Sequence, residues 1–571
     1  MKQNICNENS MMNGAEILMQ SLLAEGVDTI FGYPGGAIMP VFDALYDYRD
    51  KLKHILTRHE QGATHAAQGY ARVSGKTGVC FVTSGPAATN VITGIGDAMI
   101  DSTPLVVITG QVTANLLGTD AFQEVDMVGI TQPITKWSYQ IRRAEDVAWA
   151  VARAFYIARS GRPGPVVLDF AKNAQAGKAE FQYEPCTFIR SYIPIPEING
   201  NEIEAAAKLI NCAKKPFALI GQGVLLANAE EELKTFLEKA DIPAAATLLG
   251  LSAMPSDFRL NKGFLGMHGN VAPNMKTNEC DVLIAIGMRF DDRVTGDLNT
   301  YAKQAKVIHI DIDASEIGKN VQVAAPILGD AKTALRMLAE KINPAKHTEW
   351  IASFVEHEQC EYDKVIKNEL FPSGEQITMG EVVRRVSEAT EHKAVLVTDV
   401  GQNQMLAARY FQYSQTRSVV TSGGFGTMGF GIPAAIGAKT AAPERTVCLF
   451  CGDGGFQMTI QELGTIMQEQ TGVKMIILNN NFLGMVRQWQ ELFFNERYSF
   501  TPMQNPDFVA IAKAYGISGQ EVNKRKELDD AIADMLKDDK PYLLVVNVEP
   551  KGMVYPMTPA GTCVTNILLA P

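Results

Sequence analysis

The residues with the clearest chemistry follow two apolar runs in the last third of the chain. Gly452-Asp453-Gly454-Gly455 comes directly after the run 446–451, and Asn479-Asn480-Asn481 ends the run 473–478. Mg²⁺ prefers near-octahedral oxygen ligands and usually takes some of them from a phosphorylated partner. Asp453 and Asn480 could hold this ion together with a diphosphate, which suits the N–H groups of a glycine turn at a helix N-terminus. Asp-Gly alone is ordinary turn chemistry, so the interpretation depends on the Asn run that follows.

A second candidate acid lies near the start of the chain. Glu60 follows the short apolar run 54–56 and precedes the alanine-rich, helix-like segment 64–72. A glutamate at such a strand-to-helix junction can be partly buried and held in place. Alone, Glu60 is better explained as a first-turn acid favoured by the helix dipole. Together with the metal motif, a catalytic interpretation of Glu60 is favoured.

Short runs of mostly Val, Ile, Leu and Ala predict the strands. They lie at 79–83, 105–109 and 165–170, at 217–220, 244–247, 282–286 and 307–312, and at 394–398, 418–421, 446–451, 475–478 and 542–548. Continuous apolar runs are typical of parallel sheets covered on both faces. A two-proline linker at 189–197 and a polar stretch at 345–376 separate three such regions. We therefore predict an α/β fold of three doubly wound parallel-sheet domains, 1–188, 189–365 and 366–571.

Helices are expected at 13–26 and from 456 to about 470. A strand-to-helix turn at 84–90 is similar to the later turn at Gly452, which hints that the first and last domains are duplicates. Farther along, spacings of three and four place Met485, Val486 and Trp489 on one face of a helix. By spacing alone, that pattern is more typical of a core stripe than of a ligand site.

Two other glycine-rich sets could approach a ligand closely. The segment 423–433 has five glycines before a helix-like segment, although a packing turn would look the same. In the middle region, glycine turns follow strands at Gly221, Gly223 and Gly287, and His268 lies in a loop between glycines. Such turns occur in any doubly wound domain, and no complete G-x-G-x-x-G is present.

The bulk composition argues against several kinds of partner. A hydrophobic content of 46% and a charged content of 20% are typical of a soluble globular protein. The net charge of −11 argues against nucleic acid or an anionic membrane as a partner. No apolar run is long enough to span a bilayer. Residues 1–10 lack a signal or transit pattern, so we expect a cytoplasmic location. The nine cysteines are expected to be reduced.

Taken together, these motifs resemble the catalytic large subunits of biosynthetic acetohydroxyacid synthases, also called acetolactate synthases, which use thiamine diphosphate (ThDP). The resemblance runs from about residue 13 to residue 557, and its most specific segments are 31–40, 58–72, 83–93, 120–124, 161–166, 287–296, 422–438, 452–456 and 484–490. It implies an N-terminal pyrimidine-binding domain, a central FAD-binding domain and a C-terminal domain that binds diphosphate and Mg²⁺.

The resemblance also implies a reaction. Pyruvate would be decarboxylated on ThDP, and the resulting hydroxyethyl carbanion would condense with pyruvate to give 2-acetolactate, or with 2-ketobutyrate to give 2-aceto-2-hydroxybutyrate. This is the first common step of branched-chain amino acid biosynthesis, and FAD would have no redox role in it. The ThDP site would lie between two chains, so a homodimer or tetramer is expected. A separate regulatory small subunit is also expected.

Individual roles follow by matching positions to the family. Glu60 would bond the pyrimidine nitrogen, Arg293 the acceptor carboxylate, and Trp489 the extra methyl of 2-ketobutyrate, while Gly36, Phe122, Gln123 and Lys172 would line the site. The implied metal ligands are Asp453, Asn480 and the carbonyl of Phe482. The implied ThDP contacts are Gly401, Gln402, Asn403, Gly426, Met428, Gly452, Gly454, Gly455 and Met485. The implied FAD contacts are Arg162, Gly221, Gly223, Thr247, Leu248, Met267, His268, Gly287, Arg289, Asp291, Asp311, Ile312 and Asp330.

The chain departs from the family pattern at a few places. Asn403 stands where the family often has His, and Leu406 where it often has Trp. The family's Pro-Lys-Asp reads Ala171-Lys172-Asn173, which keeps the lysine. The tail 557–571 departs most, which leaves its role open.

Three alternatives remain open from the sequence. A catabolic, FAD-independent acetolactate synthase would share the ThDP chemistry, but Arg289–Arg293, His268 and Trp489 argue against it. A flavin-redox relative such as pyruvate oxidase would reduce its FAD with pyruvate. A non-catalytic protein of the same fold would not need Glu60, Asp453 and Asn480.

Overall fold

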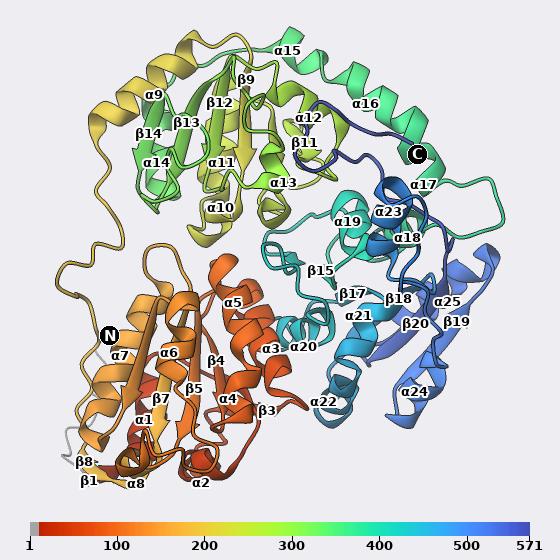
Figure 1. Ribbon diagram of the computed structural model, residues 1–571. Helices are drawn as coiled ribbons and strands as arrows, with labels where there is room; N and C mark the ends of the chain where they lie inside the picture. Colours follow the sequence, from red (N-terminus) through yellow and green to blue (C-terminus); the bar gives the residue numbers. More distant parts are fainter. Residues whose placement is uncertain (1–10, 571) are drawn as a thin grey trace. The chain divides into compact units, whose positions relative to one another are not determined.

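A computed structural model describes residues 11–570 (Figure 1). Its framework is three six-stranded sheets, in which all paired strands run parallel. The α/β fold with three parallel sheets is therefore confirmed. Within this range no helix combines the length and hydropathy needed to cross a membrane, and the eight cysteines are free. The predicted lack of a targeting segment at 1–10 concerns residues outside the range.

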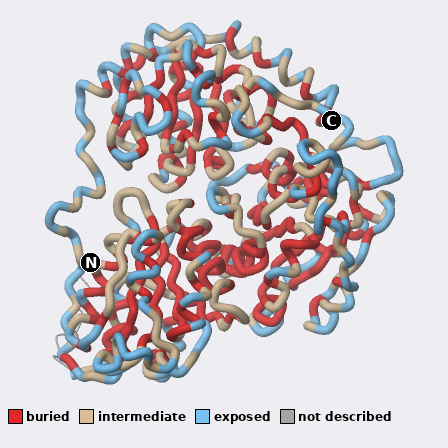
Figure 2. Tube along the Cα trace, viewed as in Figure 1, coloured by how far each residue is buried: buried red, intermediate tan, exposed pale blue. Residues whose placement is uncertain are grey.

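The first sheet has the strand order β3-β2-β4-β5-β7-β6. Its strands are β2 (Thr29–Gly32), β3 (Lys53–Leu56), β4 (Gly78–Val82), β5 (Leu105–Gln111), β6 (Trp137–Ile141) and β7 (Pro165–Ala171). The helices α1 (Gly14–Ala24), α2 (Met39–Asp47) and α7 (Val147–Arg159) share one apolar cluster with alternate residues of the central strands. The helices α3 (Glu60–Ser74) and α5 (Ile92–Ile100) pack on the same sheet. Both faces of β4, β5 and β7 are therefore buried (Figure 2), which explains their continuous apolar runs.

A late helix completes this first compact unit. The unit contains the chain up to residue 193 together with 424–442 and 459–471. Its helix α20 (Gly431–Ala441) packs against α3 so closely that a Cβ added at Gly69 or Gly437 would collide with a backbone carbonyl of the other helix. Small residues at this crossing allow the two backbones to touch.

The middle sheet has the strand order β11-β10-β9-β12-β13-β14. Its strands are β9 (Pro216–Ile220), β10 (Ala244–Ala246), β11 (Asn261–Phe264), β12 (Val282–Ile286), β13 (Lys306–Asp311) and β14 (Ala325–Leu328). The helices α9 (Gly200–Cys212), α11 (Glu230–Ala240) and α14 (Ala331–Lys341) share one buried cluster with it. Numbered within the domain, the order is 3-2-1-4-5-6, which is the order of dinucleotide-binding folds.

The third sheet has the strand order β16-β15-β17-β18-β20-β19. Its strands are β15 (Val395–Thr398), β16 (Val419–Val420), β17 (Val447–Gly452), β18 (Val473–Asn479), β19 (Ser518–Val522) and β20 (Tyr542–Asn547). The helices α18 (Met379–Ala389), α19 (Gln402–Tyr410) and α25 (Leu528–Leu536) contribute to its core. Within their domains the first and third sheets share the order 2-1-3-4-6-5, which agrees with the similarity of their turns. The predicted domain boundaries at 188/189 and 365/366 stay predictions.

Two segments differ from the expected secondary structure. The helix expected from 456 to 470 begins at Asp453 and is broken into α21 (Asp453–Met458), a 3₁₀ turn (Ile460–Glu462) and α22 (Leu463–Glu469). Thr459 causes the break, because its backbone leaves the helical region and its hydroxyl donates to the carbonyl of Gly429 at 2.9 Å. The polar stretch 345–376 carries α15 (Thr348–Ala352), α16 (Val355–Glu361), a π-helical turn (Tyr362–Ile366) and α17 (Lys367–Leu370).

The close α3–α20 crossing predicts that Gly437→Ala destabilises the protein by about 1–3 kcal/mol or more, because overpacking a rigid contact costs this much. Thermal unfolding measures the effect. Gly200→Ala is the matched control, since a Cβ there meets open space at the start of α9, and it should change stability by less than about 0.5 kcal/mol. Equal melting temperatures for both variants would contradict the crossing.

Candidate functional site

The third sheet reverses its direction of growth between β15 and β17. The chain adds β16 on one side of β15 and continues with β17 and β18 on the other. Ligands of open α/β sheets bind outside the carboxyl ends of the strands at such a switch point. Asp399 and Gly401 follow β15, and Asp453 follows β17. The predicted diphosphate motif therefore lies where the topology favours a ligand.

Asp453 is the buried acid of this switch point. It begins α21, and its predecessor Gly452 pairs in register with Leu478 near the end of β18. Its Oδ2 accepts a hydrogen bond from the amide of Asn505 at 2.6 Å, and the same amide lies 2.9 Å from Oδ1 of Asn479. Asn505 thus fixes the Asp453 carboxylate relative to the Asn run, a role that the sequence did not reveal.

The charge of Asp453 is incompletely balanced by the described residues. Its Oδ1 has no well-formed hydrogen bond within residues 11–570. Burial raises the pKa of Asp453, although Asn505 and nearby backbone N–H groups oppose the rise. A divalent cation would remove this cost, because it stabilises the ionised form and supplies the missing partner. The site therefore suits Mg²⁺.

Amide side chains order the rest of this edge. Asn480 accepts a hydrogen bond from the backbone N–H of Phe482 at 3.1 Å and donates one to Gln402 at 3.3 Å. Gln402 in turn donates to Gln488 at 3.0 Å. Asn403, the next residue of α19, donates to the carbonyl of Phe450 at 3.1 Å. The predicted ligands Asn480 and Gln402 are thus in contact.

The glycines around these side chains leave room for backbone approach. Gly401 has a φ of +136° before α19, a conformation that favours glycine. A Cβ at Gly455 would collide with the carboxylate of Asp399. Met485, from the later glycine motif, packs at the edge of the core of the third sheet. Gly452 is the last residue of β17, and Gly454 lies in the first turn of α21.

Glu60 belongs to the first unit and is the first residue of α3. It is half-buried, as expected for a strand-to-helix junction, and its Oε2 accepts a hydrogen bond from Asn90 at 2.9 Å. Just before it, the backbone N–H of Arg58 donates to both carboxylate oxygens of Glu462 at 3.1 and 3.2 Å. The start of α3 is thus held by a second, fully buried acid that the sequence did not reveal.

The other predicted residues of the first unit lie on loops or at its turns. Phe122 is 88% exposed, and Lys172 is exposed at the start of α8 (Lys172–Ala176). Gln123 has a φ of +59° and packs against Gly85. Gly36 faces open space. The remaining three are Gly426 with a φ of +64°, the half-buried Met428, and Arg162, which donates to Ser102 at 2.9 Å.

The middle sheet has its own switch point, between β9 and β12. Gly221 and Gly223 follow β9, and Gly287, with a φ of +57°, follows β12. The backbones cross so closely that a Cβ at any of the three would collide with the opposite turn. Their packing thus explains these glycines without a ligand, and it also leaves a bare backbone where a nucleotide would bind.

The acidic residues predicted to contact FAD accept hydrogen bonds from nearby backbone N–H groups. Asp291 caps α13 (Asp292–Thr295) by accepting from two backbone N–H groups, and Asp330 caps α14 by accepting from Thr333 at 2.9 Å. Asp311 ends β13 and accepts from the N–H of Asp313 at 2.9 Å. The other predicted contacts lie on nearby turns: Thr247 directly precedes the 3₁₀ turn that begins at Leu248, and Arg289 and Ile312 are half-buried.

A loop at 266–271 brings further predicted residues together. The N–H of Met267 donates to the carbonyl of Arg293 at 2.7 Å. The Arg293 side chain is 61% exposed and lies 3.5 Å from the exposed carboxylate of Asp292. His268 is buried, which lowers its pKa to about 4 with a contribution from Arg409. His268 Nδ1 has no hydrogen-bond partner among residues 11–570.

Comparison with known proteins decides the family. Family models of thiamine pyrophosphate enzymes match three parts of the chain: the N-terminal TPP binding domain at 12–130, the central domain at 203–338 and the C-terminal TPP binding domain at 399–546. The chain is 45% identical to the acetolactate synthase isozyme 2 large subunit of Escherichia coli, over 98% of this chain and 99% of that protein. It is 44% identical to the acetolactate synthase large subunit of Corynebacterium glutamicum, over 98% and 90%.

The chain belongs to the acetolactate synthase large-subunit family of thiamine pyrophosphate enzymes. The resemblance inferred from the motifs is thereby confirmed, as is the assignment to ThDP-dependent enzymes.

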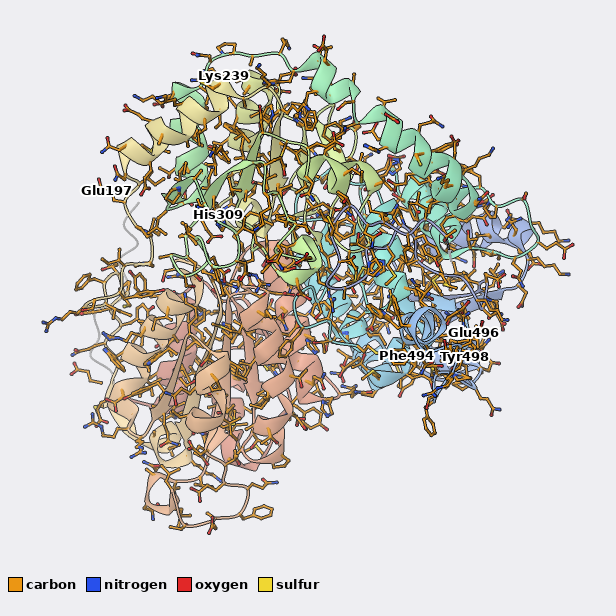
Figure 3. All side chains as sticks on the ribbon, turned by 45° about the horizontal axis from the view of Figure 1, so that its top comes forward. Glu197, Lys239, His309, Phe494, Glu496 and Tyr498 are labelled. Carbon is orange, nitrogen blue, oxygen red and sulfur yellow. The ribbon has the colours of Figure 1, made fainter. Side chains whose placement is uncertain are left out.

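One expectation for this acetolactate synthase relative was wrong. Met485, Val486 and Trp489 do not form one buried stripe on α23 (Gly484–Phe493), since Val486 is 47% exposed. The buried residues of α23 are Arg487 and Gln488. Arg487 pairs with Glu491, which also accepts a hydrogen bond from Tyr498 at 3.1 Å. Figure 3 labels Tyr498 close to Phe494 and Glu496, in the segment that follows α23. The polar residues Arg487 and Gln488 occupy the buried side of α23. The spacing of the apolar residues therefore predicted the wrong buried face for this helix.

The divergent tail has a clear position in this family member. Met557 and Leu568 form a bridge, and both pack with Trp489 in a small apolar cluster. The N–H of Thr558 donates to the carbonyl of Met267 at 2.8 Å. The tail therefore supports both Trp489 and the loop at 266–271.

The buried Glu462 predicts a pH effect on stability. Burial raises its pKa from 4.5 to about 7, so between these values the folded state binds more protons than the unfolded state. Stability should therefore fall as pH rises from about 4.5 to 7. The melting temperature of Glu462→Gln should fall less over this pH range. The control Glu204→Gln changes an exposed residue, and its melting temperature should follow that of the wild type. Parallel curves of melting temperature against pH for all three proteins would contradict the raised pKa of Glu462.

Proposed function

We propose that the protein is an acetohydroxyacid synthase. It would decarboxylate pyruvate and join the remaining two carbons to a second pyruvate, giving 2-acetolactate, or to 2-ketobutyrate, giving 2-aceto-2-hydroxybutyrate. The observation that carries the proposal is the buried Asp453 at the switch point of the third sheet, which Asn505 ties to the Asn run. It stands in a chain about 45% identical to acetolactate synthases over nearly its full length. The reaction begins branched-chain amino acid biosynthesis.

ThDP, when bound, supplies a nucleophilic carbon and an electron sink for decarboxylation. We propose that Asp453, Asn480 and the carbonyl of Phe482 would hold Mg²⁺, which would supply positive charge for the diphosphate. The unbalanced charge of Asp453 supports this assignment. The further ThDP contacts that we propose are Gly401, Gln402, Asn403, Gly426, Met428, Gly452, Gly454, Gly455 and Met485.

Glu60 is the proposed proton-handling group. A carboxylic acid at the first turn of α3, held by Asn90, can share a proton with a ring nitrogen of the cofactor. The carboxylate of Glu462 behind the turn keeps the chain entering α3 in place. Glu60 therefore acts at the cofactor, and Glu462 and Asn90 position it.

Arg293 is the proposed anchor of the acceptor. Its exposed guanidinium offers two parallel N–H donors, which match a carboxylate. Trp489, fixed by the tail, would contact the methyl that distinguishes 2-ketobutyrate from pyruvate. One methylene is worth only about 1–3 kcal/mol, so the preference should be moderate. Gly36, Phe122, Gln123 and Lys172 would line the remainder.

FAD is the proposed second cofactor, without a redox role. The support is the strand order of the middle sheet, its bare glycine crossing at the switch point and the unpartnered ring nitrogen of His268. The contacts that we propose are Arg162, Gly221, Gly223, Thr247, Leu248, Met267, His268, Gly287, Arg289, Asp291, Asp311, Ile312 and Asp330. Asp291 and Asp330 would then serve as both caps and ligands.

The proposed assembly is a homodimer or tetramer with a separate regulatory small subunit. The support for the small subunit is that relatives are named large subunits. We also propose a cytoplasmic location, consistent with the free cysteines at the described positions.

Acetolactate formation from pyruvate tests the proposal. Protein stripped of flavin should regain activity with ThDP, Mg²⁺ and FAD together, and should show little without FAD. Full activity without FAD would instead indicate a catabolic enzyme. Rapid bleaching of bound flavin by pyruvate would indicate a redox relative.

Glu60→Gln should lower kcat by about 10²–10⁴-fold, the usual contribution of a proton-transferring group, while ThDP affinity changes little. Activity assays and ThDP titration measure the two effects. Glu238→Gln, on the exposed side of α11, is the control and should match the wild type. Full activity of Glu60→Gln would rule out its catalytic role.

A further inference from the structure

The loop at 266–271 is fixed by groups from other elements. The guanidinium of Arg409, in the last turn of α19, donates to the carbonyl of His268 at 2.9 Å. The carboxylate of Glu361, at the end of α16, accepts from the N–H of Val271 at 2.6 Å and from the side-chain amide of Asn270 at 2.9 Å. The Arg409 guanidinium and the Glu361 carboxylate therefore hold different parts of one short loop.

Arg409 and Glu361 also pair with each other. Their side chains are 0% and 2% exposed, so the ion pair is fully buried. Removing two charges from water is costly, and replacing such a pair with apolar residues is often neutral or stabilising. Fold stability is therefore a weak explanation for this pair, and its contacts with the loop offer a better one.

The remaining backbone of the loop is held as well. Gly266, with a φ of +114°, exchanges two hydrogen bonds with the side chain of Asn274, at 3.0 and 2.8 Å. The N–H of Met267 donates to Arg293 and its carbonyl accepts from Thr558. Met267 and His268 are thus presented from a loop with little freedom, while the ring Nδ1 of His268 stays unpartnered within residues 11–570.

We propose that Arg409 and Glu361 are positioning residues for the flavin, which hold the loop so that Met267 and His268 meet it. The inference rests on the FAD site of the proposed function. Arginine suits the role because one planar fork can serve the carbonyl of His268 and the carboxylate of Glu361 at once. The π-helical turn that begins at Tyr362, directly after Glu361, is a kind of irregularity that is frequent at functional sites.

The test uses the full-length protein, stripped of flavin, and titrates FAD by the quenching of flavin fluorescence. The double variant Arg409→Met/Glu361→Gln removes both charges and so leaves no unpaired buried ion. It should bind FAD at least about 10-fold more weakly and shift the visible absorption of bound flavin. The control Arg385→Met/Glu381→Gln removes another pair with a buried carboxylate, on α18, and should bind FAD as the wild type does.

Arg409→Lys separates positioning from charge. Lysine keeps the charge but lacks the planar fork, so Arg409→Lys should bind FAD several-fold more weakly than the wild type. Wild-type affinity in this variant would contradict the positioning role. If the double variant fails to fold, Arg409→Lys alone decides. If the wild type binds FAD and these variants bind it equally well, this inference is wrong and the proposed function is unaffected. Wild-type protein that binds no FAD would overturn both the inference and the FAD site.

Discussion

The parallel arrangement of the strands is the constraint on which the rest of the structure depends. Parallel strands are joined by crossovers, so their carboxyl ends collect at one edge of each sheet, and a switch point leaves a crevice there. In the third sheet this edge brings Asp453 beside the Asn run through Asn505. In the middle sheet it brings Gly221 against Gly287. The chemistry that we propose takes place at these two sheet edges, where the carboxyl ends of the strands lie together.

Buried charge marks the positions where function overrides stability. Asp453 keeps an oxygen without a well-formed hydrogen bond among the described residues, and Glu462 has a pKa raised to about 7. Arg409 and Glu361 are buried together. Each would be cheaper as a neutral or apolar residue. Each instead belongs to or contacts a segment that we propose to bind a cofactor: the metal motif, the start of α3, or the loop at 266–271.

The sequence was sufficient for much of what depends on local pattern. Apolar runs located the central strands, and glycine turns marked the ends of several of them. Asn505, Glu462 and Arg409 were missed because their partners lie far away along the chain, so no spacing connects them. Local pattern also misjudged α23, where Arg487 is buried and Val486 is exposed. Asp291 and Asp330 show the converse, since a capping acid and a ligand-binding acid look alike in sequence.

The α3–α20 crossing affects how the protein must be made. The compact unit around the first sheet needs 424–442 and 459–471 in addition to the chain up to 193. At about 5–20 residues per second, synthesis reaches those segments some tens of seconds after the first sheet has emerged. Until then the small-residue face of α3 has no partner on the ribosome. The nascent chain therefore offers an open surface to chaperones, and an isolated N-terminal fragment would keep that surface exposed.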